Sequence, residues 1–121
     1  MPIRKILIVD DSPTERHALN EMLSKKGYEV VTAESGEEAI LKSKSERPDL
    51  ILMDVVMPGM NGYQATRTIT REEDTKHIPV IMCTSKGQET DKIWGMRQGA
   101  NDYMVKPIDA AALLQKIAAF G

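Results

Sequence analysis

Polar side chains suited to metal and phosphate chemistry follow four separate apolar runs of this 121-residue sequence. They are Asp10 and Asp11 after the run 6–9, Asp54 after 50–53, Thr84 after 78–83, and Lys106 after 103–105. If the fold brings them together, the three carboxylates repel one another and do not all stay ionised unless a cation joins them. A few carboxylates with waters suit Mg²⁺, whereas zinc is disfavoured because the sequence has no Cys/His cluster.

The same residue types match the needs of phosphoryl transfer. A carboxylate can act as the nucleophile and form an aspartyl phosphate. A metal ion and a lysine ammonium neutralise the phosphoryl oxygens, and a threonine hydroxyl can donate a hydrogen bond to one of them. Asp54 stands alone, whereas Asp10 and Asp11 form an adjacent pair suited to holding a metal. Asp54 is therefore the candidate nucleophile.

Apolar runs of strand length define the elements that must position these residues. The candidates are 6–9, 50–53, 78–83, 103–105 and, more weakly, 28–33. The strongest runs are continuous rather than alternating, which is typical of parallel strands covered on both faces.

Helix signals lie between the strand candidates. Ser12 with Glu15 three residues later predicts a capping box, and Pro13 occupies the first helical position. The other signals are a C-terminal cap at Gly27, a second capping box at Ser35 and Glu38, caps at Asn61 and Asp109, and a less regular stretch, 88–98, that contains Gly95. Strand and helix thus alternate five times, which predicts an α/β domain with helices on both faces of a parallel sheet. Ligands bind at the carboxyl edge of such a sheet, where the polar residues named above should converge.

Composition restricts the class of protein further. The chain is 41% hydrophobic and 28% charged, with a formal net charge of −2, which is ordinary for a globular protein. Its length of 121 residues predicts one domain over residues 1–121, with no output domain. Basic and acidic residues are balanced, so the sequence does not predict the basic surface that binds nucleic acid or an anionic membrane. One cysteine cannot form an internal disulfide. The longest apolar stretch, 50–57, is too short to span a bilayer, and the N-terminus lacks a secretory signal, so the expected location is the cytoplasm.

Four motifs, taken together, closely resemble the receiver domains of two-component response regulators. They are ILIVDDS (6–12), LILMDVVMPGMNG (50–62), VIMCTS (80–85) and DYMVKP (102–107). The resemblance covers essentially the whole chain, with the motifs in order and at the family's usual spacing. It implies a CheY-like, flavodoxin-like (βα)5 fold with strand order 2-1-3-4-5.

The resemblance also implies a metal site and a phosphorylation site. Asp54 would be phosphorylated by a partner histidine kinase, expected to be CheA-like. Mg²⁺, with Mn²⁺ as a substitute, would be bound by Asp11, Asp54 and the backbone carbonyl of Val56, and Asp10 would assist through water. The chain would then be a signalling switch and not an enzyme, catalysing only its own phosphorylation and dephosphorylation.

Three further positions match residues that respond to phosphorylation in receivers. Lys106 would contact the phosphoryl group, and its peptide bond to Pro107 would be cis. Thr84 would move toward the phosphoryl group, and Tyr103 would rotate inward behind it. An ordinary half-buried strand residue is nearly as good an interpretation of Tyr103.

A narrower resemblance concerns the pathway. The stretches 86–100 and 10–15 look like the small PilH-type regulators of type IV pilus and twitching-motility chemosensory systems. On this reading the output is a surface that binds another protein, and the chain is expected to be a monomer. Trp94, in the fourth helix candidate, could pack against the domain or belong to such a surface.

Two other functions compete with a receiver. A Mg²⁺-dependent phosphatase could use the same nucleophile, but many of these enzymes carry an acid two residues after it, where this chain has Val56. A flavin or nucleotide carrier would need a phosphate-binding loop after the first strand. The segment 10–15 (DDSPTE) places negative charge there instead.

Overall fold

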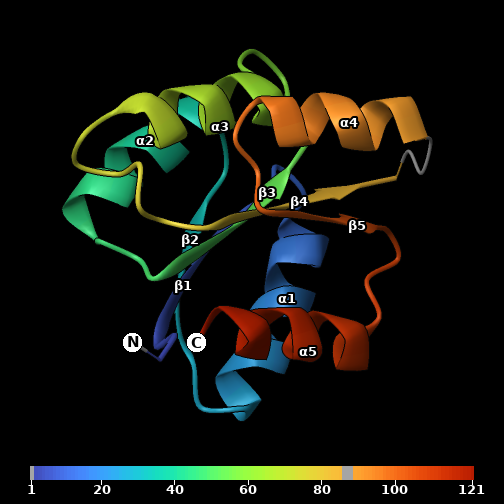
Figure 1. Ribbon diagram of the computed structural model, residues 1–121. Helices are drawn as coiled ribbons and strands as arrows, with labels where there is room; N and C mark the ends of the chain where they lie inside the picture. Colours follow the sequence, from blue (N-terminus) through green and yellow to red (C-terminus); the bar gives the residue numbers. More distant parts are fainter. Residues whose placement is uncertain (1, 86–88) are drawn as a thin grey trace.

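The computed structural model describes residues 2–85 and 89–121, in which strands and helices alternate along the chain (Figure 1). The strands are β1 (Lys5–Val9), β2 (Glu29–Ala33), β3 (Leu50–Asp54), β4 (Val80–Thr84) and β5 (Asp102–Val105). The helices are α1 (Pro13–Lys25), α2 (Gly36–Ser45), α3 (Gly62–Arg71), α4 (Glu89–Arg97) and α5 (Ala110–Phe120). All strand pairs are parallel, in the order β2-β1-β3-β4-β5. The fold and strand order predicted from the sequence are therefore confirmed.

Each strand differs from the sequence prediction by one or two residues at its ends, and the differences in β3 and β4 bear on the site. β4 begins at Val80 and not at Ile78, because Pro79 has no N–H to donate to a strand ladder. β3 continues through Asp54, whose register partner on β4 is Cys83. Asp54 therefore belongs to the last residue pair of two central strands, which fixes its backbone firmly.

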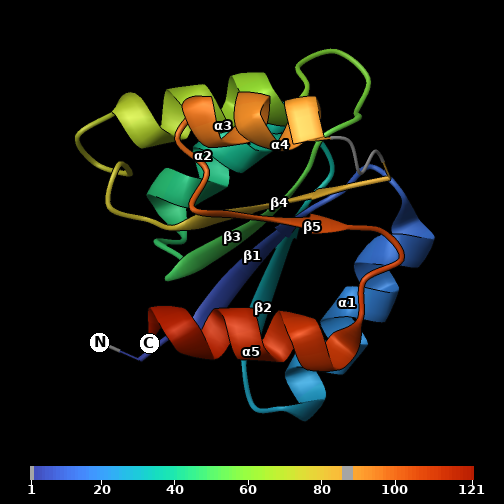
Figure 2. The ribbon, with the colours of Figure 1, turned by 45° about the vertical axis from the view of Figure 1, so that its right-hand side comes forward.

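Two buried clusters fill the space on either side of the sheet. Side chains alternate between the faces of each strand, so Leu7 and Met53 face one side while Ile8 and Leu52 face the other. α2, α3 and α4 cover the first face, and α1 and α5 cover the second (Figures 1 and 2). β1, β3 and β4 are buried on both faces, which accounts for their continuous apolar sequences.

α4 contains Gly95 without interruption, and this glycine has a packing role. A Cβ at Gly95 would lie 3.0 Å from the sulfur of Met82 and 3.4 Å from the ring of Tyr63. The missing side chain thus lets the helix approach the sheet closely. The predicted start of this helix at residue 88 lies outside the described residues.

The described helices include none that is both long enough and apolar enough to cross a membrane.

Candidate functional site

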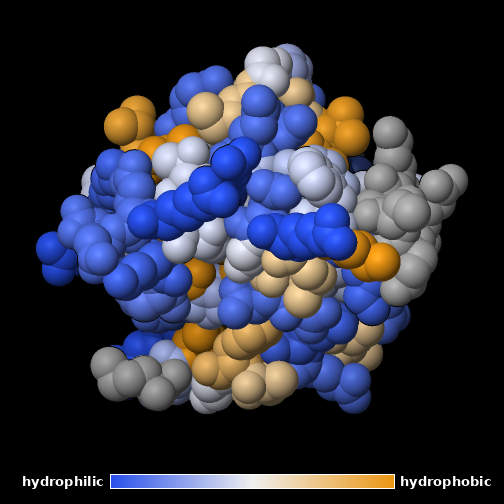
Figure 3. Space-filling model, turned by 45° about the horizontal axis from the view of Figure 1, so that its top comes forward, coloured by the Kyte–Doolittle hydropathy of each residue, from blue (hydrophilic) through white to orange (hydrophobic). Residues whose placement is uncertain are grey.

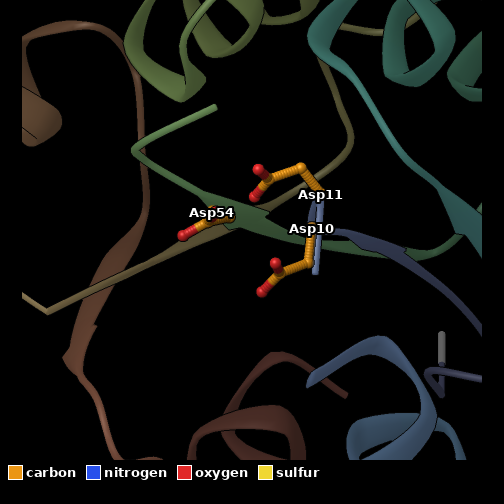
Figure 4. Close-up of side chains that lie close together, drawn as sticks. All are labelled: Asp10, Asp11 and Asp54. Atoms are coloured by element: carbon orange, nitrogen blue, oxygen red, sulfur yellow. The ribbon is translucent and has the colours of Figure 1, made fainter. Parts of the chain in front are cut away.

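The carboxyl ends of the strands bring together residues from distant parts of the chain. Asp10 and Asp11 directly follow β1, Asp54 and Thr84 end β3 and β4, and Lys106 directly follows β5. In Figure 4 the carboxylates of Asp10 and Asp11 are turned toward the side on which Asp54 lies. The convergence predicted from the sequence is present for these acidic residues and for Lys106.

Three carboxylates form a cluster of oxygen ligands. One carboxylate oxygen from each of Asp10, Asp11 and Asp54 lies within 4.8 Å of the others. Asp10 and Asp54 are only 2% and 5% exposed, whereas Asp11 is exposed. Asp10 is held in place because its Oδ1 accepts the backbone N–H of Ser12 at 2.9 Å. An oxygen-only donor set with an exposed member fits a hard divalent cation that keeps several waters, as Mg²⁺ does.

Lys106 is the cationic centre of the site. Its Nζ donates to Asp10 Oδ2 and to Asp54 Oδ1, both at 3.0 Å, and to Glu15 Oε2 at 2.6 Å. An ammonium has three N–H donors, so these contacts use all of them. Its backbone N–H also donates to the carbonyl oxygen of Thr84 at 2.6 Å, which ties the end of β5 to the end of β4.

Burial and charge shift the pKa values of the site in opposite directions. Burial raises the pKa of Asp10 to about 6, with smaller contributions from Glu15 and Asp54, although the Ser12 N–H and Lys106 lower it. Burial also raises the pKa of Asp54, against the lowering effect of Lys106. The Lys106 pKa is raised, because hydrogen bonds to three carboxylates outweigh the opposing effect of burial. The carboxylates are thus incompletely neutralised by Lys106, and a cation would favour their ionised forms.

The backbone behind Asp54 requires a glycine at the start of α3. A Cβ at Gly62 would lie 2.1 Å from the carbonyl oxygen of Asp54 and 2.9 Å from the Cα of Val55. Gly62 N–H also donates to the Val55 carbonyl oxygen at 2.9 Å. α3 therefore begins in direct backbone contact with the segment that carries Asp54, which anchors the residue from behind.

The remaining predicted site residues lie around this centre. Thr84 is buried at the end of β4, and Tyr103 is buried, at 8% exposure, in the cluster beneath α4. The side chain of Val56 is exposed. The peptide bond between Lys106 and Pro107 is cis.

Sequence reasoning missed one member of the site, Glu15. The spacing from Ser12 predicted a capping box, and half of it forms, because Ser12 Oγ accepts the Glu15 N–H at 3.3 Å. The reciprocal bond is replaced: Ser12 N–H donates to Asp10, and the Glu15 carboxylate accepts from Lys106. The predicted box at Ser35 is likewise only half formed, since Glu38 Oε1 accepts from the Glu34 N–H. Glu15 follows Asp11 by four positions, about one helical turn, and this spacing was the sequence signal that could have placed it at the site.

Two further residues, Cys83 and Trp94, lie outside the centre. Cys83 is buried, and burial raises the pKa of its thiol to about 12, so it remains protonated and suits a core role. Trp94 is 51% exposed and packs edge-to-face with Tyr63, with ring centroids 6.5 Å apart. The tryptophan thus both packs against the domain and contributes to its surface.

A doubly wound parallel sheet with clustered aspartates and a lysine at its carboxyl edge defines a receiver-type α/β domain. Residues 6–118 match the model of the response regulator receiver domain. The chain belongs to this family.

Curated relatives include proteins of similar and of greater length. The chain is 55% identical over 113 residues to Protein PilH of Pseudomonas aeruginosa, covering 93% of each chain. It is 42% identical to the probable transcriptional regulator ycf27 of Pyropia yezoensis, but spans only 45% of that protein.

Solved structures with the same fold cover nearly the whole chain. Chemotaxis protein CheY4 of Vibrio cholerae is 34% identical with a TM-score of 0.92, and the match covers 98% of this chain and 99% of that one. The receiver domain of sensor histidine kinase PA1611 from Pseudomonas aeruginosa is 32% identical with a TM-score of 0.89, covering 97% and 96%. Its structure contains a magnesium ion in the active-site cleft.

Proposed function

We propose that this chain is a phosphoacceptor switch in which Asp54 receives a phosphoryl group from a histidine kinase. The observation that carries the proposal is the position of Asp54, which lies in a cluster of carboxylates and accepts a hydrogen bond from Lys106 at 3.0 Å. Groups suited to act as nucleophile, metal ligands and neutralising cation therefore lie in one site.

The chemical step transfers phosphorus from nitrogen to oxygen. A carboxylate oxygen of Asp54 attacks the phosphorus of a phosphohistidine, the P–N bond breaks, and the departing imidazole nitrogen takes up a proton. The product is a mixed anhydride on Asp54, which water later hydrolyses to restore the carboxylate and release inorganic phosphate. Lys106 stabilises the negative charge of the transferring group.

Asp11, Asp54 and the carbonyl of Val56 are the proposed ligands of Mg²⁺, with Asp10 assisting through water and Mn²⁺ as a substitute. The ion would neutralise charge on the phosphoryl oxygens. Support comes from the clustered oxygens, from the incomplete neutralisation described above, and from the magnesium ion in the similar PA1611 receiver.

Thr84, Tyr103 and Lys106 are the proposed switch residues. Phosphorylation adds nearly two negative charges at the strand ends, and Thr84 and Lys106 would pair with them. Tyr103 would follow by rotating within the cluster beneath α4. A partner protein that prefers the altered surface then shifts the equilibrium by its differential affinity.

We assign the switch to a chemosensory pathway of type IV pilus twitching motility, with a CheA-like kinase as phosphodonor. The resemblance to PilH-type regulators and the 55% identity with PilH support this assignment. We further propose a cytoplasmic monomer. In Figure 3 the visible face over α2, α3 and α4 is mainly hydrophilic, with hydrophobic residues in separate small patches, so this face offers no large apolar surface to a second copy of the chain.

Intact-mass analysis after incubation with acetyl phosphate tests the proposal. Wild-type protein should gain one phosphoryl group in the presence of Mg²⁺ and none after chelation. Asp54→Ala should gain none while retaining its fold by circular dichroism. Equal labelling of the Asp54→Ala protein would show that Asp54 is not the acceptor.

A further inference from the structure

Glu15 occupies an unusual position for a residue in the first turn of a surface helix. Its carboxylate contacts Lys106 at 2.6 Å, a shorter distance than the 3.0 Å from Lys106 to either Asp10 or Asp54. The three carboxylates come from α1, the end of β1 and the end of β3, and converge on one ammonium group. Glu15 is therefore a direct competitor for the cation that Asp54 uses.

A phosphoryl group on Asp54 requires a rearrangement of Lys106. All three N–H donors of the ammonium are already used by carboxylates. Phosphorylation removes the charge of the Asp54 carboxylate, so one donor can pass from Asp54 to the phosphoryl group, but any further hydrogen bond from Lys106 to that group must replace Asp10 or Glu15. The question is which carboxylate gives up its contact with Lys106.

Burial and anchoring identify Glu15 as the carboxylate that can leave. The Asp10 side chain is 3% exposed and is fixed by the Ser12 N–H, whereas the Glu15 side chain is 45% exposed. A released Glu15 carboxylate is hydrated at once, while a released Asp10 carboxylate would be left buried and unpaired. A hollow of about 310 Å³, bordered by Leu19, Met22 and Ile108, opens beside Glu15 and gives the side chains room to change rotamer.

On the basis of the phosphoacceptor function proposed above, we propose that Glu15 is a positioning residue that holds Lys106 in the unphosphorylated state and must release it when Asp54 is phosphorylated. The Glu15 carboxylate thereby slows phosphorylation and weakens binding of a phosphoryl group at Asp54.

The electrostatics of the site agree with this role. Lys106 lowers the pKa of Glu15, mainly through their hydrogen bond, so Glu15 is ionised when it makes the contact. Glu15 and Asp54 contact the same ammonium group, so the charge of Glu15 lies close to the acceptor. The same charge opposes an incoming anionic phosphodonor.

The test compares Glu15→Gln with a matched variant on the same helix. Glutamine keeps the size of the side chain and loses its charge. Glu21→Gln is the control, because Glu21 is also an exposed glutamate of α1 and its recorded ion pair is to His17, at 3.8 Å. Phosphorylation by acetyl phosphate is followed by intact mass at saturating Mg²⁺, so that a change in metal affinity does not contribute.

We expect Glu15→Gln to be phosphorylated about two- to fivefold faster than wild type, the range for loss of a partly exposed ion pair. Glu21→Gln should match wild type. Repeating the comparison in a Lys106→Met background separates release of Lys106 from a direct charge effect. There the acceleration should largely disappear. An unchanged rate in Glu15→Gln, or an equal acceleration without Lys106, overturns the proposal.

Binding of beryllofluoride, a phosphoryl mimic, supplies a second readout by calorimetry. Glu15→Gln should bind it two- to fivefold more tightly than wild type. If wild type gains no phosphoryl group and binds no beryllofluoride, the phosphoacceptor function fails and this inference fails with it. If wild type does both and Glu15→Gln behaves identically, only the role of Glu15 is wrong.

Discussion

The first turns of α1 and α3 begin with similar sequence signals and use them differently. In α3, Asn61 and Gln64 form a complete capping box, with each side chain bonded to the other's backbone N–H at 3.0 Å. In α1, Ser12 caps the helix, but Glu15 turns away from the backbone and pairs with Lys106. At the start of α3 both capping bonds stay within the helix end, whereas at the start of α1 the Glu15 side chain bonds to Lys106 in the functional site.

The two helix starts therefore have different roles, structural support in α3 and a charged contact with the site in α1. The α3 start supports Asp54 through backbone contact at Gly62 and contributes no charge to the site. The α1 start contributes the Glu15 carboxylate, which is neutralised by Lys106. Perturbing α3 should therefore affect stability, whereas perturbing α1 should affect charge and pH dependence.

The largest effect is expected from Gly62→Ala. The new Cβ would overlap the Asp54 carbonyl oxygen at 2.1 Å, and backbone on both sides must move. We expect a loss of about 3 kcal/mol or more in the free energy of unfolding, measured by urea denaturation, together with slower phosphorylation.

Gly27→Ala is the matched control for this change. Gly27 has a positive φ of 92°, but no atom lies within 4 Å of its Cβ position. It should lose only about 1–2 kcal/mol, the cost of a left-handed residue, and leave phosphorylation intact. Equal losses in the two variants would show that contact with Asp54 is not what makes Gly62 necessary.

A smaller, pH-dependent effect is expected from Asp10→Asn in metal-free protein. The folded-state pKa of about 6 lies above the ordinary 3.8, so the folded protein binds this proton more tightly than the unfolded chain. The resulting stability is present below about pH 4 and is lost as the pH rises through 6. Asp10→Asn should therefore be more stable than wild type at pH 7, by roughly 1–3 kcal/mol, and similar to it at pH 4.

Urea denaturation at both pH values, with and without Mg²⁺, measures this difference. Mg²⁺ should stabilise wild type more than Asp10→Asn, because the ion favours the ionised carboxylate. Equal stability of the two proteins at pH 7 without metal would contradict the burial of an under-neutralised charge at Asp10.

The smallest effect concerns the caps themselves. Asn61→Ala removes a complete capping box and should cost about 1 kcal/mol. Glu15→Ala should cost less, because its carboxylate does not cap α1 and its ion pair is partly exposed. Thermal denaturation at moderate salt compares them, and a larger loss in Glu15→Ala would mean that α1 relies on this side chain after all.

The sequence was sufficient for the strands and for most of the site because both depend on local signals. Continuous apolar runs identified the strands, and the polar residue ending each run identified Asp10, Asp54 and Lys106. The role of Glu15 could not be predicted in this way, because its partner lies 91 positions away and only the fold brings them together. The need for Gly62 was equally hidden, since it arises from backbone proximity to Asp54.

The backbone hydrogen bond from Lys106 to Thr84 has a mechanical consequence. The two residues proposed to contact the phosphoryl group are joined by this main-chain bond, so movements of the two strand ends are coupled. Val105 stands between Lys106 and the rest of β5, and its side chain is 46% exposed. A displacement of Lys106 therefore acts directly on Val105, which is exposed. A partner protein that contacts Val105 would be only one residue away from the phosphorylation site.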